Sequence, residues 1–374
     1  MHALTTPRQL LLDQFVEDGG AYTFNRYDIA VRYLAAEELV SKTQGPGIAL
    51  YKKMQQERLG MSDHDADMYV KKFKLLIRSI QANGYNYASP IIVNKHLRVI
   101  DGAHRLACIL LFANVSKFEI LIREDGDPRY GIDWFENRNF SPKELNLVNK
   151  TWDLIKFNYR ISEDFAKKKV ADIISLKEAY TASKQLLGRG DFYQSCPLLK
   201  LTGQRSTLHR LEKYSIESVI NANSQLLDIG CNTGFISLVL SRYVKHVDAI
   251  DINADLVSVG NEAKRILDIP NCTLYNISFE DFNVTAKYDI ILSLVVDFYT
   301  RYTFIEFCDK VKGLLNPGGY FLLESGDVTT VDKNFDKKIK YLLYSGFSLK
   351  VAGEIKDDNK ILRRFILAKK ALED

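Results

Sequence analysis

The chain has 374 residues, of which 46% are hydrophobic and 26% are charged. This composition is typical of a globular protein with room for two hydrophobic cores, and it excludes a disordered chain. The 51 basic and 47 acidic residues leave a formal net charge of +4. The charges are nearly balanced, so the chain has no strong overall electrostatic field that would indicate nucleic-acid binding.

The cysteines and the apolar segments indicate in which cellular compartment the protein is expected to function. The five cysteines are odd in number and have no CxxC spacing, which favours a reducing compartment and no zinc site. Residues 1–20 lack the apolar stretch of a signal peptide, and no apolar run reaches the roughly 20 residues that a membrane span needs. We therefore expect a cytoplasmic protein with no membrane span and no metal. The sequence does not indicate an oligomeric state.

Two helical patterns occupy the first part of the chain. Residues 26–40 have apolar positions at helical spacing, with acidic residues on the other positions. A second pattern ends near residue 84 and predicts a helix with Leu75, Leu76 and Ile80 facing inward. Gly84 is expected to end this helix.

Residues 89–112 predict two short strands followed by an apolar helix. The strands are expected at 91–93 and 97–100, and the helix begins with Asp-Gly-Ala-His-Arg at 101–105. Gly102 supplies the tight turn, and the free backbone N–H groups of the first helical turn favour an anion. The guanidinium group of Arg105 adds a positive charge and paired N–H donors that can bind a phosphate.

This turn resembles that of the ParB/sulfiredoxin fold, in which a Gly-x-His-Arg turn holds nucleotide phosphates. The resemblance implies that Gly102, His104 and Arg105 bind ATP or CTP with magnesium. Ala103 stands where sulfiredoxins carry their reactive cysteine, and the helix-turn-helix of the DNA-partitioning members is absent. A small-molecule phosphotransferase remains, with Asp101 as the general base. The alternatives are a CTP-dependent switch and a structural helix cap.

The second informative stretch is LLDIGCNTGF at 226–235. It predicts an apolar strand, a tight turn with Gly230 and Gly234, and the apolar start of a helix. Glycine suits a backbone that passes close to a nucleotide-like ligand, because a Cβ would block the approach or the required φ. About twenty residues later a second apolar strand ends in Asp251, which is placed to accept both hydroxyls of a ribose.

The details of this turn distinguish between two cofactor classes. A dinucleotide turn has a glycine where this chain has Asn232, and Asp228 would repel a pyrophosphate. A cationic sulfonium with an amino-acid ammonium group would be favoured there. The arrangement resembles class I S-adenosylmethionine (SAM) methyltransferases over roughly residues 192–370. The alternative is a glycine turn in an ordinary α/β domain.

The resemblance also implies a fold and a set of site residues. A third strand within 271–282, a buried strand within 287–302, a strand at 320–324 and a final antiparallel pair complete a Rossmann-like, seven-stranded sheet. Asp297 and Tyr299 follow a buried strand where the substrate should lie, and they are catalytic candidates together with Arg205. The cofactor candidates are Tyr193, Asp228, Gly230, Cys231, Asn232, Gly234, Asp251, Ile252, Phe279, Glu280 and Ser293.

Residues 192–214, FYQSCPLLKLTGQRSTLHRLEKY, come before the glycine turn. This segment resembles the lead-in of a bacterial methyltransferase group that includes enzymes of surface glycan and tRNA wobble-base modification. In that group a Tyr-x-Ser and a Gly-x-Arg-Ser/Thr element fold over the cofactor. Tyr193, Arg205 and Thr207 would then line the pocket, whereas a solvated basic helix start would explain the same residues without a site.

We therefore expect an α/β chain in three parts. These are a ParB/sulfiredoxin-like α+β domain at 1–127, a helical connector and cap at 128–215, and the methyltransferase domain at 216–374. The predicted activity is bifunctional: phosphorylation of a surface glycan or small metabolite, followed by methylation. The alternatives are an O- or N-methyltransferase with a non-catalytic or CTP-switch domain, and a nucleic-acid methyltransferase.

Overall fold

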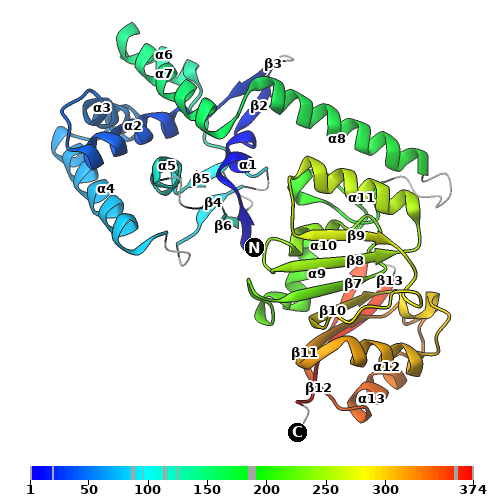
Figure 1. Cartoon of the computed structure of the whole chain (residues 1–374). Coiled ribbons are helices and arrows are strands. Elements are labelled where there is room, and N and C mark those ends of the chain that lie inside the picture. The colour runs from blue at the N-terminus through cyan, green and yellow to red at the C-terminus, as the bar shows by residue number, and fades with distance from the viewer. Residues whose placement is uncertain are drawn as a thin grey trace. The chain divides into compact units, whose positions relative to one another are not determined.

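The computed structural model describes residues 2–18, 21–85, 89–94, 96–112, 115, 117–123, 126–183, 191–357 and 361–372. The chain forms two compact units, 1–171 and 172–374, whose elements are labelled in Figure 1. The predicted connector at 128–215 is thereby shared between the units, and the three-part division stays a prediction. Among the described residues, no helix is long and apolar enough to cross a membrane.

The first unit contains a small mixed sheet with the strand order β1-β6-β4-β5. Strand β4 runs parallel to β6, whereas β1–β6 and β4–β5 are antiparallel pairs. A separate hairpin is formed by β2 and β3. The bounds are β1 His2–Thr5, β2 Phe15–Asp18, β3 Ala21–Phe24, β4 Ile91–Val93, β5 Val99–Asp101 and β6 Phe118–Ile122.

Helix α2 forms the centre of the helical layer of this unit, because it packs against α3, α5 and α7. Apolar side chains on several of its faces are fully buried, as expected for a helix surrounded by others. The helices are α1 Pro7–Leu12, α2 Tyr27–Ser41, α3 Gly47–Leu59, α4 Asp63–Asn83, α5 Ala103–Phe112, α6 Ile132–Glu136, α7 Pro142–Tyr159 and α8 Glu163–Ser183, which continues into the second unit.

The predicted inner face of α4 is partly wrong. Leu75 is 63% exposed, and the buried residues are Ala66, Phe73 and Ile77. These three define a narrow stripe, because only one side of the helix meets its neighbours. The predicted end of the helix is confirmed: Gly84 has a φ of 73° and its backbone N–H bonds to the carbonyl of Ile80 at 2.9 Å.

The second unit is built on a seven-stranded sheet in the order β12-β13-β11-β10-β7-β8-β9. Neighbouring strands from β11 through β9 are parallel, and β13 pairs antiparallel with β11 and β12. This confirms the predicted Rossmann-like sheet with its antiparallel closing pair. The bounds are β7 Gln225–Ile229, β8 His246–Asp251, β9 Cys272–Asn276, β10 Tyr288–Leu294, β11 Leu315–Glu324, β12 Phe347–Asp357 and β13 Ile361–Lys370.

Strand β11 begins earlier than predicted, at Leu315, so the Asn-Pro-Gly-Gly stretch belongs to it. A register shift opposite residues 288–290 accommodates this stretch. The helical segments of this unit are η2 Pro197–Leu199, α9 Thr207–Tyr214, η3 Ile216–Ser218, α10 Phe235–Leu240, α11 Ala254–Ile266, η4 Asp297–Tyr299, α12 Phe304–Leu314 and α13 Phe335–Tyr344.

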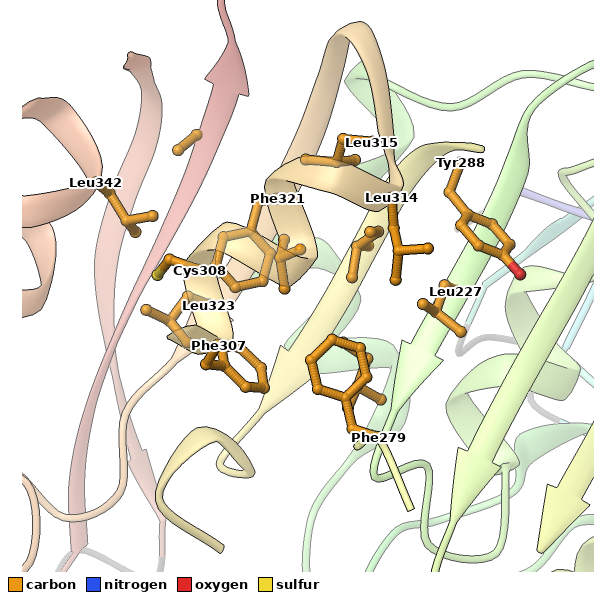
Figure 2. Packing of buried hydrophobic residues seen from close by; sticks show 14 of the residues in the cluster. Leu227, Phe279, Tyr288, Phe307, Cys308, Leu314, Leu315, Phe321, Leu323 and Leu342 are labelled. Atoms are coloured by element: carbon orange, nitrogen blue, oxygen red, sulfur yellow. The ribbon is translucent and has the colours of Figure 1, made fainter. Parts of the chain in front are cut away.

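Helices α12 and α13 cover one face of this sheet and bury a large apolar cluster, part of which is drawn in Figure 2. Phe307 of α12 and Leu342 of α13 are fully buried against Phe321 and Leu323 of β11. Helix α9 lies on the opposite face, where the Tyr214 ring packs edge-on against Phe365. The sheet therefore lies between α12 and α13 on one face and α9 on the other.

Candidate functional site

The glycine turn after β7 has the backbone conformation that its sequence predicts. Gly230 and Gly234 have φ values of 68° and 67°, which favour glycine. Asn232 also has a positive φ, of 55°, and asparagine tolerates this region better than most residues. A Cβ at Gly230 would collide with the side chain of Val296, which follows β10. The turn is therefore packed directly against the end of the neighbouring strand.

The carboxylate of Asp251, at the end of β8, is fixed by backbone amides. One oxygen accepts a hydrogen bond from the N–H of Asn232 at 2.8 Å, and the other accepts one from the N–H of Asn253 at 2.9 Å. Burial raises the pKa of Asp251 and these backbone bonds act in the opposite direction. The predicted ribose acid and the predicted glycine turn are thus in direct contact.

Asp228 lies in β7, just before the turn, and its side chain is 2% exposed. Burial raises its pKa to about 7, although the hydroxyl of Ser237 and the charge of Arg210 favour the ionised form. A cation placed next to this carboxylate would lower its pKa, because an opposite charge stabilises the carboxylate. Positive charge next to Asp228 is therefore favoured, and a phosphate there would be repelled.

The segment after β10 carries backbone strain. Val295 has a φ of 71°, a conformation that is a genuine outlier for a β-branched residue. Its N–H is held by the carbonyl of Glu324 at 3.1 Å. Such outliers cluster at functional sites, and this one lies where the chain leaves the sheet toward the predicted substrate side.

The two predicted catalytic residues of η4 have different environments. Asp297 is 3% exposed and pairs with Lys338 at 2.6 Å, and Lys338 also contacts Asp332 at 2.9 Å. Burial raises the pKa of Asp297 and Lys338 opposes this. Tyr299 is 74% exposed, and its ring contacts that of Phe298 at 4.5 Å between centroids. Tyr299 is therefore open to a substrate, whereas Asp297 is enclosed.

The predicted adenine-side residues separate into buried and accessible positions. Phe279 is 3% exposed and its ring joins the core cluster beside Phe307 (Figure 2). The carboxylate of Glu280 accepts a hydrogen bond from the backbone N–H of Arg301. Ser293 and Cys231 are buried, at 0% and 7% exposure. Ile252 is 72% exposed next to Asp251, so it offers an open apolar surface at the sheet edge.

The two elements of the lead-in lie side by side. The backbone N–H of Ser195 bonds to the carbonyl of Arg205 at 2.9 Å, and the Thr207 hydroxyl donates to the carbonyl of Ser195 at 2.6 Å. A Cβ at Gly203 would collide with the backbone of Gln194, which explains the glycine of the Gly-x-Arg element. The Tyr193 hydroxyl accepts a hydrogen bond from Arg205 at 3.1 Å. The alternative of a solvated helix start does not apply to Arg205, which is 4% exposed.

Sequence reasoning missed a buried cluster in which two arginines share one carboxylate. Arg205 contacts Glu324 at 2.8 Å, and Arg210 contacts the other oxygen of the same carboxylate. Burial would raise the pKa of Glu324, but Arg210 and Arg205 hold it below its usual range. The available signal was a glutamate at the end of an apolar strand, which sequence alone does not connect to Arg210.

In the first unit, the predicted phosphate turn is present but its side chains have other partners. Gly102 has a φ of 92°, and a Cβ there would crowd the backbone of Ile91. Arg105 contacts Asp101 at 3.2 Å and donates to the backbone carbonyl of Ser89. Asp101 itself is exposed, with 68% of its side chain accessible.

His104 points into the unit instead of toward solvent. Its Nε2 lies 2.8 Å from the Tyr51 hydroxyl and accepts a hydrogen bond from Arg32 Nε at 3.4 Å. Burial and the neighbouring Arg32 hold the pKa of His104 well below its usual value. Arg32 in turn pairs with Asp28 at 2.7 Å. These contacts give His104 a packing role, so its phosphate-binding role stays a prediction.

In the described parts of either unit, no group of three or more His, Cys, Asp or Glu side chains is placed so that it could hold a metal ion. All five cysteines are buried and free of disulfides. Burial raises the pKa of Cys108 to about 12 and that of Cys272 to about 12. The thiols of Cys108 and Cys272 are therefore uncharged at neutral pH.

Residues 220–366 match the family model described as a methyltransferase domain. Together with the sheet order and the glycine turn, this match decides the nature of the second unit. Residues 220–366 form a class I SAM-dependent methyltransferase domain. The domain contains the glycine turn, Asp251, η4 and Glu324, whereas the lead-in precedes it.

Three curated methyltransferases are similar to part of this chain. An uncharacterized methyltransferase of Schizosaccharomyces pombe is 27% identical over 151 residues, covering 33% of this chain and 53% of that protein. The alpha N-terminal protein methyltransferase 1 of Arabidopsis thaliana is 25% identical over 199 residues, covering 49% and 67%. The U6 snRNA methylphosphate capping enzyme Amus of Drosophila melanogaster is 29% identical over 142 residues, covering 31% and 45%. The chain thus spans about half to two thirds of the length of these relatives.

Proposed function

We propose that this chain transfers the methyl group of SAM to a glycan or another small molecule. The observation that carries the proposal is the direct hydrogen bond between the glycine turn and the acid that follows β8, at Asn232 and Asp251. A dinucleotide would require space and positive charge at this turn, whereas Asn232 and the nearby Asp228 provide neither. SAM carries the sulfonium and the ammonium group that fit this environment.

The residues of the domain have separate tasks in this proposal. SAM, when bound, supplies an electrophilic methyl group. Asp251 receives the ribose hydroxyls, and Asp228 receives the ammonium group. Ile252 offers an apolar contact to the adenine. Tyr299, which is exposed at the end of β10, contacts the acceptor, and alignment with exclusion of water provides most of the rate increase.

The charge of the chain supports a glycan or another small molecule as the methyl acceptor. The formal net charge of +4 is spread over 51 basic and 47 acidic residues, which is not the footprint of a nucleic-acid enzyme. The curated relatives are named for a protein N-terminus and for a methylphosphate cap of an RNA, so their names do not agree on an acceptor. A nucleic-acid acceptor is the alternative, and binding that falls steeply with salt would favour it.

For the first unit we keep a second proposal, in which the turn at 101–105 binds the phosphates of ATP or CTP with magnesium. It is supported by the positive φ of Gly102, which directly precedes α5, a helix of ten residues. Asp101 is accessible and would act as the base, as phosphotransfer requires. The ion pair of Arg105 with Asp101 has to open for this role.

Two measurements test these proposals separately. Calorimetry with SAM and with S-adenosylhomocysteine tests the second unit, and absence of heat with both ligands would refute the SAM proposal. Mass spectrometry of glycan and metabolite acceptors incubated with ATP, SAM or both tests the order of the reactions. A product that gains methyl alone, with or without ATP, rules out phosphorylation before methylation and leaves an O- or N-methyltransferase with a non-catalytic first unit.

A further inference from the structure

Two buried carboxylates share one ammonium group where the chain leaves β10. Lys338 of α13 lies 2.6 Å from Asp297 of η4 and 2.9 Å from Asp332, in the loop before α13. Asp297 and Asp332 are 3% and 5% exposed, and the side chain of Lys338 is 14% exposed. The three side chains therefore keep an excess negative charge away from water. Such a charge is costly unless a cation joins it.

Asp297 is the member of this group whose hydrogen bonds are incomplete. Its Oδ2 contacts Lys338, whereas its Oδ1 is buried and has no hydrogen-bond partner among the described residues. An ionised carboxylate only accepts hydrogen bonds, and a charged group left unsatisfied costs more than a neutral one. A ligand that completes this arrangement has to bring an N–H or O–H group, and a positive charge would also offset the excess of acid.

The surroundings of Asp297 already bind one ammonium group. The Nζ of Lys338 lies 5.6 Å from the ring centroid of Phe298 and 5.5 Å from that of Phe304. The faces of aromatic rings attract cations, so rings and carboxylates act together on Lys338. The same two kinds of group would attract a second ammonium group at Oδ1. A phosphate or a carboxylate there would be repelled by the two acids.

This group lies beside the turn at which SAM is proposed to bind. Val296 packs against Gly230, where a Cβ would collide with the valine side chain. Asp297 is the next residue along the chain, and consecutive Cα atoms are about 3.8 Å apart. A ligand held by Asp297 is therefore one residue away from the glycine turn.

We propose that Asp297 binds and deprotonates the amino group of the methyl acceptor, so that the acceptor is an amino sugar or another small amine and the methyl group is transferred to nitrogen. This rests on the proposed SAM binding. Lys338 is a positioning residue, because it occupies one oxygen of Asp297 and leaves the other to the acceptor.

The transfer balances with the groups named. Asp297 takes a proton from the ammonium form of the acceptor and leaves a neutral amine. The nitrogen lone pair then forms the new C–N bond while the C–S bond of the sulfonium breaks, and its electron pair stays on sulfur. The products are an N-methylated ammonium and S-adenosylhomocysteine. Burial raises the pKa of Asp297, which makes its carboxylate a stronger base for this step.

Phe298 controls access to the Asp297 carboxylate in this proposal. It contacts Lys338 through its ring and is 37% exposed, so it lies between the ion pair and solvent. An amine reaches Oδ1 by displacing this ring. Tyr299, whose ring is 4.5 Å from that of Phe298 and which is 74% exposed, is open to the remainder of the acceptor.

The test uses two matched pairs of probes on protein saturated with S-adenosylhomocysteine. Glucosamine is compared with glucose, and benzylamine with benzyl alcohol, by calorimetry. In at least one pair the amine should bind roughly 10- to 100-fold more tightly than its hydroxyl partner, because a charged hydrogen bond is gained. A preference within the first pair alone indicates an amino sugar, and a preference within the second pair indicates another small amine.

Three results of this comparison have different meanings. Equal or absent binding of amine and hydroxyl probes in both pairs overturns the amine proposal. Tighter binding of glucose 6-phosphate than of both amines also overturns it and favours an anionic acceptor. Absence of S-adenosylhomocysteine binding refutes the proposed SAM site itself, and this is measured first.

Asp297→Asn identifies the residue responsible. The variant should bind S-adenosylhomocysteine as the wild type does and lose the preference for the amine, because an amide carries no charge. Asp309→Asn is the matched control, since Asp309 is an exposed acid on α12, and it should keep the preference. If Asp297→Asn still prefers the amine, the assignment to Asp297 is wrong. The wild-type comparison needs no variant and decides on the amine even if Asp297→Asn does not fold.

Lys338→Met provides an independent check. It leaves two buried acids without their ammonium group, so the ligand-free protein should melt at a lower temperature. The amine preferred by the wild type should then raise the melting temperature by more than it does for the wild type, because it supplies the missing positive charge. A purely structural role of Lys338 predicts no such difference, and an equal increase in both proteins would contradict an amine bound at Asp297.

Discussion

The carboxylate of Asp251 accepts a hydrogen bond from the backbone N–H of Asn232 at 2.8 Å. This bond joins the carboxyl ends of β7 and β8, and it involves the residue that replaces the middle glycine of a dinucleotide turn. The acid therefore shapes the turn, and in the proposed function it also accepts the ribose hydroxyls. Substitutions at Asp251 should change ligand affinity more than they change stability.

Asp251→Ala should weaken SAM binding by about 1.5–3 kcal/mol, because a charged acceptor for the ribose hydroxyls is lost. Calorimetry with SAM measures this. Asp255→Ala is the matched control, since Asp255 is an exposed acid in the first turn of α11 and should leave the affinity unchanged. Equal affinities of wild type and Asp251→Ala would contradict the assigned role.

SAM affinity should depend on pH through Asp228. Its pKa of about 7 lies above the ordinary aspartate value because of burial, so the carboxylate that pairs with the ammonium group is mostly protonated below pH 6. Affinity should rise between pH 6 and pH 8 as the proton is lost, and binding near pH 7 should release protons. Titration in buffers of different ionisation enthalpy measures the release. Asp228→Asn should bind weakly at every pH without this rise.

The same pKa affects stability without ligand. The folded chain binds more protons at Asp228 than the unfolded chain does between the ordinary aspartate pKa and about 7. The contribution of Asp228 to the free energy of unfolding is therefore greatest at low pH and falls as the pH rises through this window. Denaturant unfolding of wild type and Asp228→Asn across this range isolates the effect, because the variant lacks the titrating group.

Val295→Gly should stabilise the protein by about 0.5–2 kcal/mol. The substitution removes strain of about 1–3 kcal/mol at a φ of 71°, and glycine gives back about 0.5–1 kcal/mol through its greater freedom in the unfolded chain. Asn232→Gly is the comparison, because asparagine tolerates a positive φ and less strain is relieved. Urea unfolding measures both, and a destabilised Val295→Gly would show that the side chain contributes more than the strain costs.

Gly230→Ala should destabilise the protein by about 2–4 kcal/mol, because the new Cβ meets Val296 and the φ of 68° is unfavourable for alanine. Gly313→Ala in α12 should instead stabilise it by about 0.5–1 kcal/mol, because nothing lies near its Cβ and alanine favours a helix. Thermal unfolding of the two variants compares the positions directly. Similar melting temperatures would contradict the close packing of the turn.

Arg105→Ala should abolish ATP or CTP binding and leave SAM affinity unchanged, because the two sites belong to different units and distant substitutions act independently. Equilibrium dialysis with labelled nucleotide measures the first effect. If the wild type binds neither nucleotide, Arg105 and Asp101 form only a surface ion pair. Binding and hydrolysis without phosphate transfer would indicate a CTP-dependent switch.

The sequence predicted the methyltransferase domain well because its signals are local. The glycine turn, the acid at the end of β8 and the strand β10, which is buried on both faces of the sheet, can each be recognised from a few adjacent residues. Leu75 was placed wrongly because the α4 sequence offers several apolar positions, and only its packing decides which face inward. The shared carboxylate of Glu324 depends on a contact between residues more than a hundred positions apart, which no local pattern encodes.

His104 illustrates the same limit at the other predicted site. The Asp-Gly-Ala-His-Arg pattern correctly predicts a turn between β5 and α5. The direction of the His104 side chain, however, is decided by Tyr51 and Arg32, which belong to α3 and α2. A motif can specify the path of the backbone while the neighbouring elements determine what its side chains contact.

The packing of Gly230 against Val296 also has a consequence for the order of folding. Strands β7 and β10 are neighbours in the sheet, although β8 and β9 lie between them in the chain. The turn therefore lacks its support until β10 has been synthesised and has docked, and docking of such distant segments is slow. During synthesis, the chain should acquire affinity for its cofactor only after residue 296 has left the ribosome.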